Sequence, residues 1–228
     1  VYMSPENRAQ EVLRQITEEF SIKEGPVIED IEGPTEAYTV KGGSKGDSIH
    51  IDVSGYSDTE ELVNRYLHEA VHVYQNRVEK DYSFSEKEER YLEPLLEGQA
   101  DFISGNGVYQ DAEEIYTEFL AEADEASPGK ALGRTSQRYA FSNVKAEVEK
   151  EGTSEKVWMP VKLSRDGSHH ISGSEAEMLT EKRYGNNGRK IKSIDTVRSF
   201  PLDYREEGID ADKLGDYLIN VQNKIEEL

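Results

Sequence analysis

Apolar residues recur at helical spacing in three long segments of the chain. The first segment runs from about Ser4 to Phe20, and the last runs from about Asp210 to Leu228. Both have apolar residues three or four positions apart, the period of a helix with one buried face. A third helix is predicted from Asp58 to about Lys80, because Ser57 and Glu60 have the spacing of a capping box at its start.

Four shorter segments also have a helical pattern. They run from Ser85 to about Ser104, from Ala112 to Ala126, from Ser136 to Lys150 and from Ser174 to Tyr184. Ser85 with Glu88 supplies a second start signal. Pro94 lies inside the segment that follows and predicts either a kink or the first turn of a new helix.

Strand patterns occur in two places. Between Pro26 and Val53, β-branched and aromatic residues lie among Gly and Pro turn signals, which predicts a small antiparallel sheet. The run from Ser48 to Val53 alternates most regularly and is expected to be a strand. A second strand is expected from Val157 to Leu163.

The order of these elements predicts an α+β fold. A small N-terminal antiparallel or mixed sheet comes first, and a mostly helical C-terminal lobe follows it. We expect one domain over residues 1–228, with sublobes at about 1–80 and 81–228.

The chain is strongly acidic. Its formal net charge is −20, from 47 acidic and 27 basic residues among 228. This charge would repel nucleic-acid phosphates and anionic membrane surfaces, so neither is expected as a partner. No apolar run approaches the length of a membrane span. Two interpretations of this acidity remain, a halophilic surface suited to high salt and an ordinarily acidic protein; we favour the first because the acidic residues are spread along the whole chain.

Cysteine is absent from the sequence. No thiolate can bind a metal, so any zinc site must use His and carboxylate ligands. The acidic loops carry no EF-hand pattern, so the sequence does not support a Ca²⁺ site. No signal peptide is visible, and a chain that starts at Val1 is expected to be a trimmed product. The expected location is extracellular or the cell envelope, with the cytoplasm as the alternative.

The run from Tyr66 to Gln75 contains the strongest chemical signal. His68 and His72 are spaced i, i+4 on a predicted helix, so both rings lie on one face and can share one cation. Glu69 lies next to His68, where it can reach a water on that metal and act as the general base. Apolar neighbours make a buried site a better interpretation than two unrelated surface histidines.

A third ligand must be a carboxylate, because no histidine follows at the spacing of three-histidine sites. Glu97 is the candidate, and Asp101 one turn later could accept the free N–H of a ligand histidine. Glu93 is the rival, one turn before Glu97. We favour Glu97 because Gly and Ala follow it and would let two helices approach closely.

These residues together resemble a known arrangement. His68-Glu69-x-x-His72 followed by Glu97-x-x-x-Asp101 resembles the gluzincin motif of thermolysin-like peptidases. The same runs are similar to those of the plant basic secretory proteins. The resemblance implies a zincin-like fold, one catalytic Zn²⁺ and a peptide or protein substrate.

Thermolysin-like enzymes also carry His-x-x-Ser-Gly in a loop before a helix, and residues 166–173 contain a similar run. His169 takes the place of the oxyanion donor, and Asp166 that of the acid that orients it, while His170 competes for the donor role. The gap between His72 and Glu97 is longer than in that family. Its upstream Tyr has no clear counterpart, since Tyr91 is out of register.

The sequence therefore predicts a zinc metallopeptidase in which Glu69 activates water. The alternative is a catalytically inactive zincin-like binding domain with a retained zinc site. The strand from Ser48 to Val53 is expected to form a site edge along which an extended peptide pairs.

Overall fold

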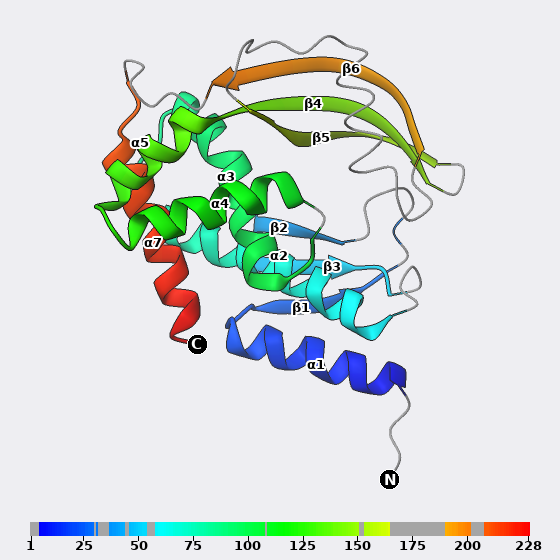
Figure 1. Ribbon diagram of the computed structural model, residues 1–228. Helices are drawn as coiled ribbons and strands as arrows, with labels where there is room; N and C mark the ends of the chain where they lie inside the picture. The colour runs from blue at the N-terminus through cyan, green and yellow to red at the C-terminus, as the bar shows by residue number, and fades with distance from the viewer. Residues whose placement is uncertain are drawn as a thin grey trace.

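The computed structural model describes residues 5–29, 31, 37–43, 46–53, 58–107, 109–150, 153–164, 190–201 and 208–228. Its elements are α1 (Pro5–Glu19), β1 (Glu24–Ile28), β2 (Ala37–Gly43), β3 (Gly46–Ile51), α2 (Thr59–Glu79), α3 (Glu86–Ser104), α4 (Gln110–Ala123), α5 (Pro128–Arg138), β4 (Tyr139–Lys150), β5 (Thr153–Ser164), β6 (Lys190–Pro201) and α7 (Ala211–Glu226). The fold is α+β, with two separate sheets and helices packed between them (Figure 1). None of the described helices is both long and apolar enough to cross a membrane.

The N-terminal sheet is mixed. Its strand order is β1-β3-β2, with β1 parallel to β3 and β2 antiparallel to it. The sequence predicted an antiparallel or mixed sheet; the parallel pairing of β1 rules out the antiparallel alternative, and the β2–β3 hairpin is antiparallel as expected. Ile49 and Ile51 of β3 are fully buried in a core that also contains Leu13 of α1 and Val71 of α2.

The position of β3 corrects one functional prediction. The strand from Ser48 to Val53 was expected to offer an edge to a substrate, but β3 lies in the middle of the sheet, bonded on both sides. Its backbone groups are already used, so no peptide can add to it. Within the described residues β2 pairs only with β3, and Ala37 of β2 lines the cleft described below.

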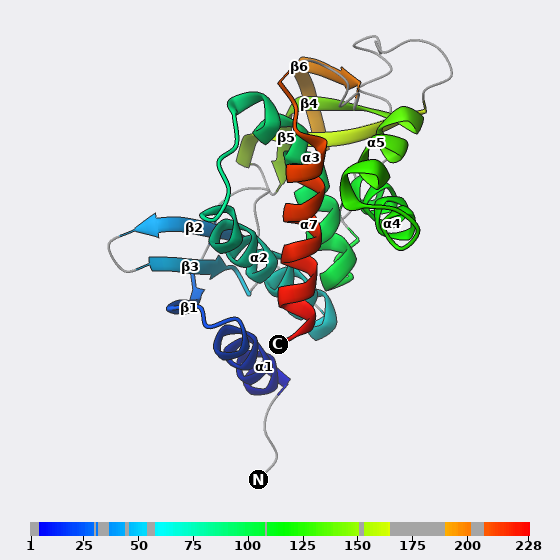
Figure 2. The same cartoon turned by 90° about the vertical axis from the view of Figure 1, so that its left-hand side faces the viewer.

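Helix α2 connects the two halves of the molecule. One of its faces contacts α1, β2 and β3, and the opposite side contacts α3 and α7 (Figure 2). Val71 belongs to the N-terminal core, whereas Val78 belongs to a second core built on α3, α4, α5 and α7. The helix begins at an N-cap Asp58, whose carboxylate accepts from the backbone N–H of Glu60. The predicted cap, Ser57, lies outside the described residues.

Helix α3 begins as the sequence predicts and is tied to the C-terminal helix. Ser85 and Glu88 form the capping box. The buried Glu88 carboxylate also accepts a hydrogen bond from Lys213 Nζ at 2.8 Å and one from the backbone N–H of Asp210 at 3.2 Å. Pro94 lies inside one continuous helix, so the prediction of a new helix start there is wrong.

The C-terminal half is less helical than predicted. The segment expected to be a helix from Ser136 to Lys150 contains strand β4 instead. Strand β5 confirms the prediction for Val157–Leu163, whereas α5 and β6 were not predicted. The three strands form an antiparallel sheet of order β5-β4-β6 at the end of the molecule away from α1 (Figure 1). The segment from Ser174 to Tyr184 lies outside the described residues.

The pairing of β4 with β6 explains why β6 lacks a strand pattern. The apolar residues of β6 recur every three positions, and those of β4 every two. The register contains two irregularities and places Ile191, Ile194 and Val197 opposite Val148, Ala146 and Val144, respectively. At each irregularity β6 has one residue more than β4. These extra residues align the apolar positions of β6, which are three residues apart, with those of β4, which are two residues apart.

Candidate metal centre

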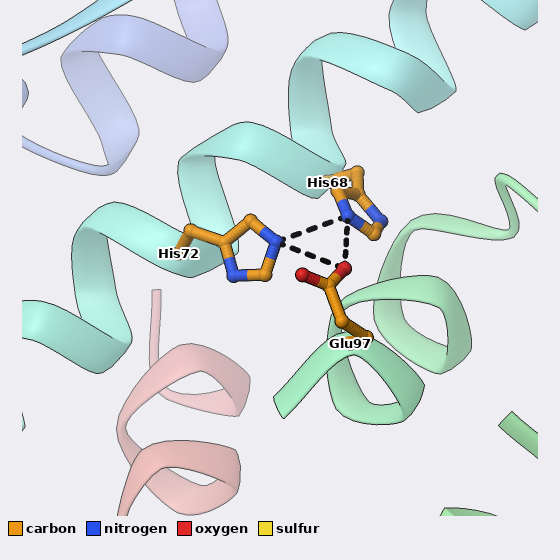
Figure 3. Close-up of side chains that lie close together, drawn as sticks. All are labelled: His68, His72 and Glu97. Atoms are coloured by element: carbon orange, nitrogen blue, oxygen red, sulfur yellow. Dashed lines mark hydrogen bonds and ion pairs between the residues drawn. The ribbon is translucent and has the colours of Figure 1, made fainter. Parts of the chain in front are cut away.

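The candidate site lies where α2 and α3 face each other. The two helices run in opposite directions, since Asn64 contacts Gly105 near one end and Gln75 contacts Leu96 nearer the other. His68 and His72 lie on the face of α2 that meets α3. From α3, Glu97 points into the space between the two rings (Figure 3). These two contacts set the register of α2 against α3 and place Glu97 opposite the two histidines.

Three ligand-type atoms converge at this point. The Nε2 atoms of His68 and His72 are 3.0 Å apart. Glu97 Oε2 lies 3.2 Å from His68 Nε2 and 3.4 Å from His72 Nε2. A tetrahedral zinc ion with bonds of about 2.1 Å would place its ligand atoms about 3.4 Å apart. The cluster therefore fits such an ion with little movement of the side chains.

The other nitrogen of each ring already faces an acceptor. His72 Nδ1 lies 2.7 Å from Gln75 Oε1, and His68 Nδ1 lies 2.8 Å from Asp101 Oδ1. The Asp101 oxygen lies off the N–H direction, so this second contact is a close polar contact rather than a well-directed hydrogen bond. Since an oxygen acceptor faces Nδ1 of each ring, the hydrogen of each neutral imidazole is assigned to Nδ1.

Consequently, two ring lone pairs and a carboxylate oxygen face one another. Three acceptors without a donor between them repel, so the cluster needs a cation, either a proton or a metal ion. His68, His72 and Glu97 are the described residues grouped closely enough to hold such an ion.

The pKa values of His72 and Glu97 follow from this geometry. Burial alone would lower the pKa of His72, but the charge and hydrogen bond of Glu97 outweigh it and raise that pKa to about 9. Burial would raise the pKa of Glu97, but His72 and His68 hold it well below its usual range. In the absence of metal, the cluster is thus held together by a proton on His72 facing an ionised Glu97.

Glu69 faces the same cleft and has its own partner. The guanidinium of Arg65, one turn earlier on α2, lies 3.2 Å from Glu69 Oε1. The two side chains are only 12% and 7% exposed, so the ion pair is shielded from water. The Arg65 Nη2 also donates to the backbone oxygen of Ala37 at 3.4 Å. These contacts fix the Glu69 carboxylate beside the cluster of His68, His72 and Glu97.

A cleft of about 660 Å³ opens over these groups. It is lined by His68, Glu69, His72 and Glu97, by Arg65 and Tyr109 and, farther along the two helices, by Glu79, Glu86, Glu89 and Glu93. The Tyr109 ring stacks against His68, with centroids 5.8 Å apart. Burial, followed by the charge of Glu97, raises the pKa of the Tyr109 phenol, which therefore stays protonated at neutral pH.

Several predicted site residues lie elsewhere. Glu93 is exposed and lines the cleft without joining the cluster. Tyr91 is buried in the second core. His169, Asp166 and His170 lie outside the described residues.

Three residues at the site were not assigned a role from the sequence. Arg65 has a detectable signal, because it lies four positions before Glu69 on the same helix face. Gln75 also has one, since it lies three positions after His72. Tyr109 has none, because a loop after α3 brings it to the site, where its backbone N–H donates to Asp101 Oδ2.

His50 lies apart from this centre, on β3. Its Nδ1 is 2.9 Å from Glu29 Oε1, and its Nε2 is 3.1 Å from Ser48 Oγ. These distances resemble those of a hydrolytic triad. However, Ser48 is only 5% exposed in the middle of the sheet, so a substrate cannot reach its hydroxyl. We interpret this array as a contact that joins β1 to β3.

Comparisons of the chain with protein-family models, with curated proteins and with solved structures found no match. The function is therefore inferred from the chemistry of the site.

Proposed function

We propose that the chain is a zinc-dependent metallopeptidase of the gluzincin type, with a zincin-like fold. The observation that carries this proposal is the convergence of three lone pairs from His68, His72 and Glu97 beside the carboxylate of Glu69. Two imidazoles and a carboxylate suit zinc and leave its fourth position open to the cleft. A purely structural site would need no such base.

Zinc in this position would supply a Lewis acid that polarises the scissile carbonyl and acidifies a water. The carboxylate of Glu69 takes a proton from the attacking water and returns it to the leaving amine. Arg65 keeps that carboxylate in place from one turn away. Tyr109, protonated and stacked on His68, is placed to donate a hydrogen bond in the cleft. A donor role for His169 remains the proposal that its sequence motif supports.

A peptide substrate fits the shape of the site. The cleft is long, because it follows α2 from Arg65 to Glu79, which at 1.5 Å per residue is about 21 Å. The edge of β2 lies at one side of it, through Ala37.

The decisive experiment compares Glu69→Gln with the wild type. The amide keeps the shape but cannot accept a proton, so peptide hydrolysis should fall by at least about 100-fold while zinc still binds. Glu61→Gln, on the exposed side of the same helix, is the matched control and should keep full activity. Cleavage of a peptide library and metal content by mass spectrometry are the two measurements. Full hydrolysis by Glu69→Gln would refute the mechanism.

The second candidate is a zincin-like binding domain that retains zinc without cleaving. The buried Arg65–Glu69 ion pair is the observation that favours it, because the carboxylate is already engaged. One zinc per chain with no cleavage at low or high salt would support this candidate over the peptidase.

A further inference from the structure

A chain of hydrogen-bonded side chains leads from His72 to the C-terminal helix α7. Its members are Gln75 on α2, Gln99 on α3, Tyr116 on α4, and Gln222 and Glu226 on α7, and we call it the amide relay. The first four are buried, and Gln99 and Tyr116 have no exposed surface. The relay thus crosses the second core and joins four helices.

The direction of the first amide is fixed by a backbone group. Gln75 Nε2 donates to the backbone oxygen of Leu96 at 3.0 Å and to Gln99 Oε1 at 3.1 Å. Rotating this amide by 180° would place two oxygens against each other. Gln75 Oε1 must therefore face His72, where it accepts from Nδ1 at 2.7 Å.

The next amide is fixed in the same way. Gln99 Nε2 donates to the backbone oxygen of Leu218 at 3.0 Å and to the Tyr116 hydroxyl at 2.6 Å. The hydroxyl then donates to Gln222 Oε1 at 2.9 Å, and Gln222 Nε2 donates to Glu226 Oε1 at 2.8 Å. Every donor points away from His72, and the last acceptor is an exposed carboxylate.

A chain of hydrogen bonds that all run in one direction influences the candidate metal site through its first member, Gln75, which accepts from His72. Aligned hydrogen bonds in a buried region polarise one another. A group that accepts one hydrogen bond becomes a stronger donor in the next. At His72 the result is a ring with its hydrogen held on Nδ1 and its Nε2 lone pair directed at the cluster. Partners of this kind commonly change metal affinity about 10- to 100-fold.

We propose that the amide relay orients His72 and couples metal affinity to the packing of α7. The proposal rests on the metal site of the proposed function and does not require hydrolysis. It makes Gln75 a positioning residue for His72. It also makes α7 part of the metal centre, although no residue of α7 belongs to the cluster. By linkage, metal binding should in turn stabilise α7.

Two tyrosines provide a matched pair for the test. Tyr116→Phe removes the hydroxyl that links the two halves of the relay. Tyr66→Phe removes an equally buried hydroxyl that is hydrogen-bonded to Thr17 Oγ1 of α1 at 2.6 Å, away from the relay and from α7. Tyr116→Phe loses two hydrogen bonds and Tyr66→Phe loses one, and both keep the ring, so melting of the metal-free variants shows how much each loses in packing alone.

The measurement is the Kd for zinc by competition with a chelator, together with thermal melting of each metal-free variant. We expect Gln75→Leu to weaken zinc binding about 10- to 100-fold and Tyr116→Phe by at least about threefold. Tyr66→Phe should remain within about twofold of the wild type. Should Tyr116→Phe fail to fold, Gln222→Leu cuts the relay one link later and is expected to act in the same direction.

Hydrogen exchange gives a readout that a merely structural role would not move. Zinc should slow amide exchange in α7 of the wild type, and this protection should be lost in Tyr116→Phe but kept in Tyr66→Phe. Equal zinc affinities for the two tyrosine variants would overturn the relay and leave the proposed function standing. A wild-type protein that binds no zinc would overturn both.

Discussion

The two histidines of the candidate metal site are held in one tautomer by different kinds of partner. A carboxylate, that of Asp101, lies against His68, whereas a neutral amide, that of Gln75, accepts from His72. Both keep the hydrogen on Nδ1 and direct Nε2 at the cluster. The metal-free centre then compensates with a proton, which is why the pKa of His72 rises to about 9 in spite of its burial.

This pKa predicts how zinc binding depends on pH. Below about pH 9, zinc must displace the proton on His72, so its apparent affinity should fall about tenfold for each pH unit between 8 and 6. The metal-free protein behaves in the opposite sense. The raised pKa stabilises it fully below about pH 6.5, and that stabilisation is lost as pH rises through 9.

Calorimetry in buffers of different ionisation enthalpy should therefore detect about one proton released per zinc at pH 7. The melting temperature gained on adding zinc should also grow from pH 6 to 8. Zinc affinity that does not change over this range would show that His72 is already neutral in the metal-free protein.

At the scale of elements, the centre depends on how closely α3 approaches α4. Gly98, next to Glu97, makes this approach possible, because a Cβ at this position would lie 2.2 Å from the main-chain oxygen of Ala112. A side chain here must push the two helices apart. Since Glu97 is the neighbouring residue, such a shift moves the carboxylate relative to both histidines.

We therefore expect Gly98→Ala to destabilise the protein by about 2 kcal/mol or more and to weaken zinc binding. Gly133 in α5 is the matched control, because a Cβ there meets nothing within 4 Å. Gly133→Ala should leave zinc binding unchanged and stabilise the protein by up to about 1 kcal/mol. Urea unfolding and chelator competition measure the two effects. A Gly98→Ala variant as stable as the wild type would mean that the helices can separate freely.

Elements with a signal in their own residues were predictable from the sequence. The capping box of Ser85 and Glu88 marks the start of α3, and the i, i+4 spacing of Glu97 and Asp101 marks its site face. Strand β4 was mistaken for a helix, although Val144, Ala146 and Val148 alternate with charged residues at period two.

Other features were not encoded locally. Strand β6 gains its register only from bulges opposite β4. The parallel pairing of β1 with β3, the approach of Tyr109 and the amide relay all depend on contacts between segments distant in the chain. Periodicity and short motifs cannot report such contacts.

At the scale of the whole molecule, the acidic residues lie mainly outside the two cores. Among the described residues, Glu69, Glu88, Asp101 and Asp111 are the buried carboxylates. The first three face Arg65, Lys213 and His68, respectively, so their charges are compensated. The excess of 47 acidic over 27 basic residues must then act largely at the surface, where it repels itself.

This repulsion makes stability depend on salt. The screening length falls from about 30 Å at 0.01 M to about 8 Å at 0.15 M, which is short compared with the size of the protein. We expect the melting temperature to rise by at least about 4 °C between these concentrations of NaCl, since each kcal/mol of relieved repulsion is worth about 2–4 °C at this chain length. Sucrose at equal osmolality is the control: it stabilises proteins by exclusion from their surface without screening charge, so its effect should be smaller than the rise caused by NaCl. The same rise should shrink as pH is lowered toward the sequence pI of about 4.7, where the net charge vanishes. A melting temperature that is flat with NaCl at pH 7 would mean that the surface acids are compensated locally and would remove the basis for a high-salt habitat.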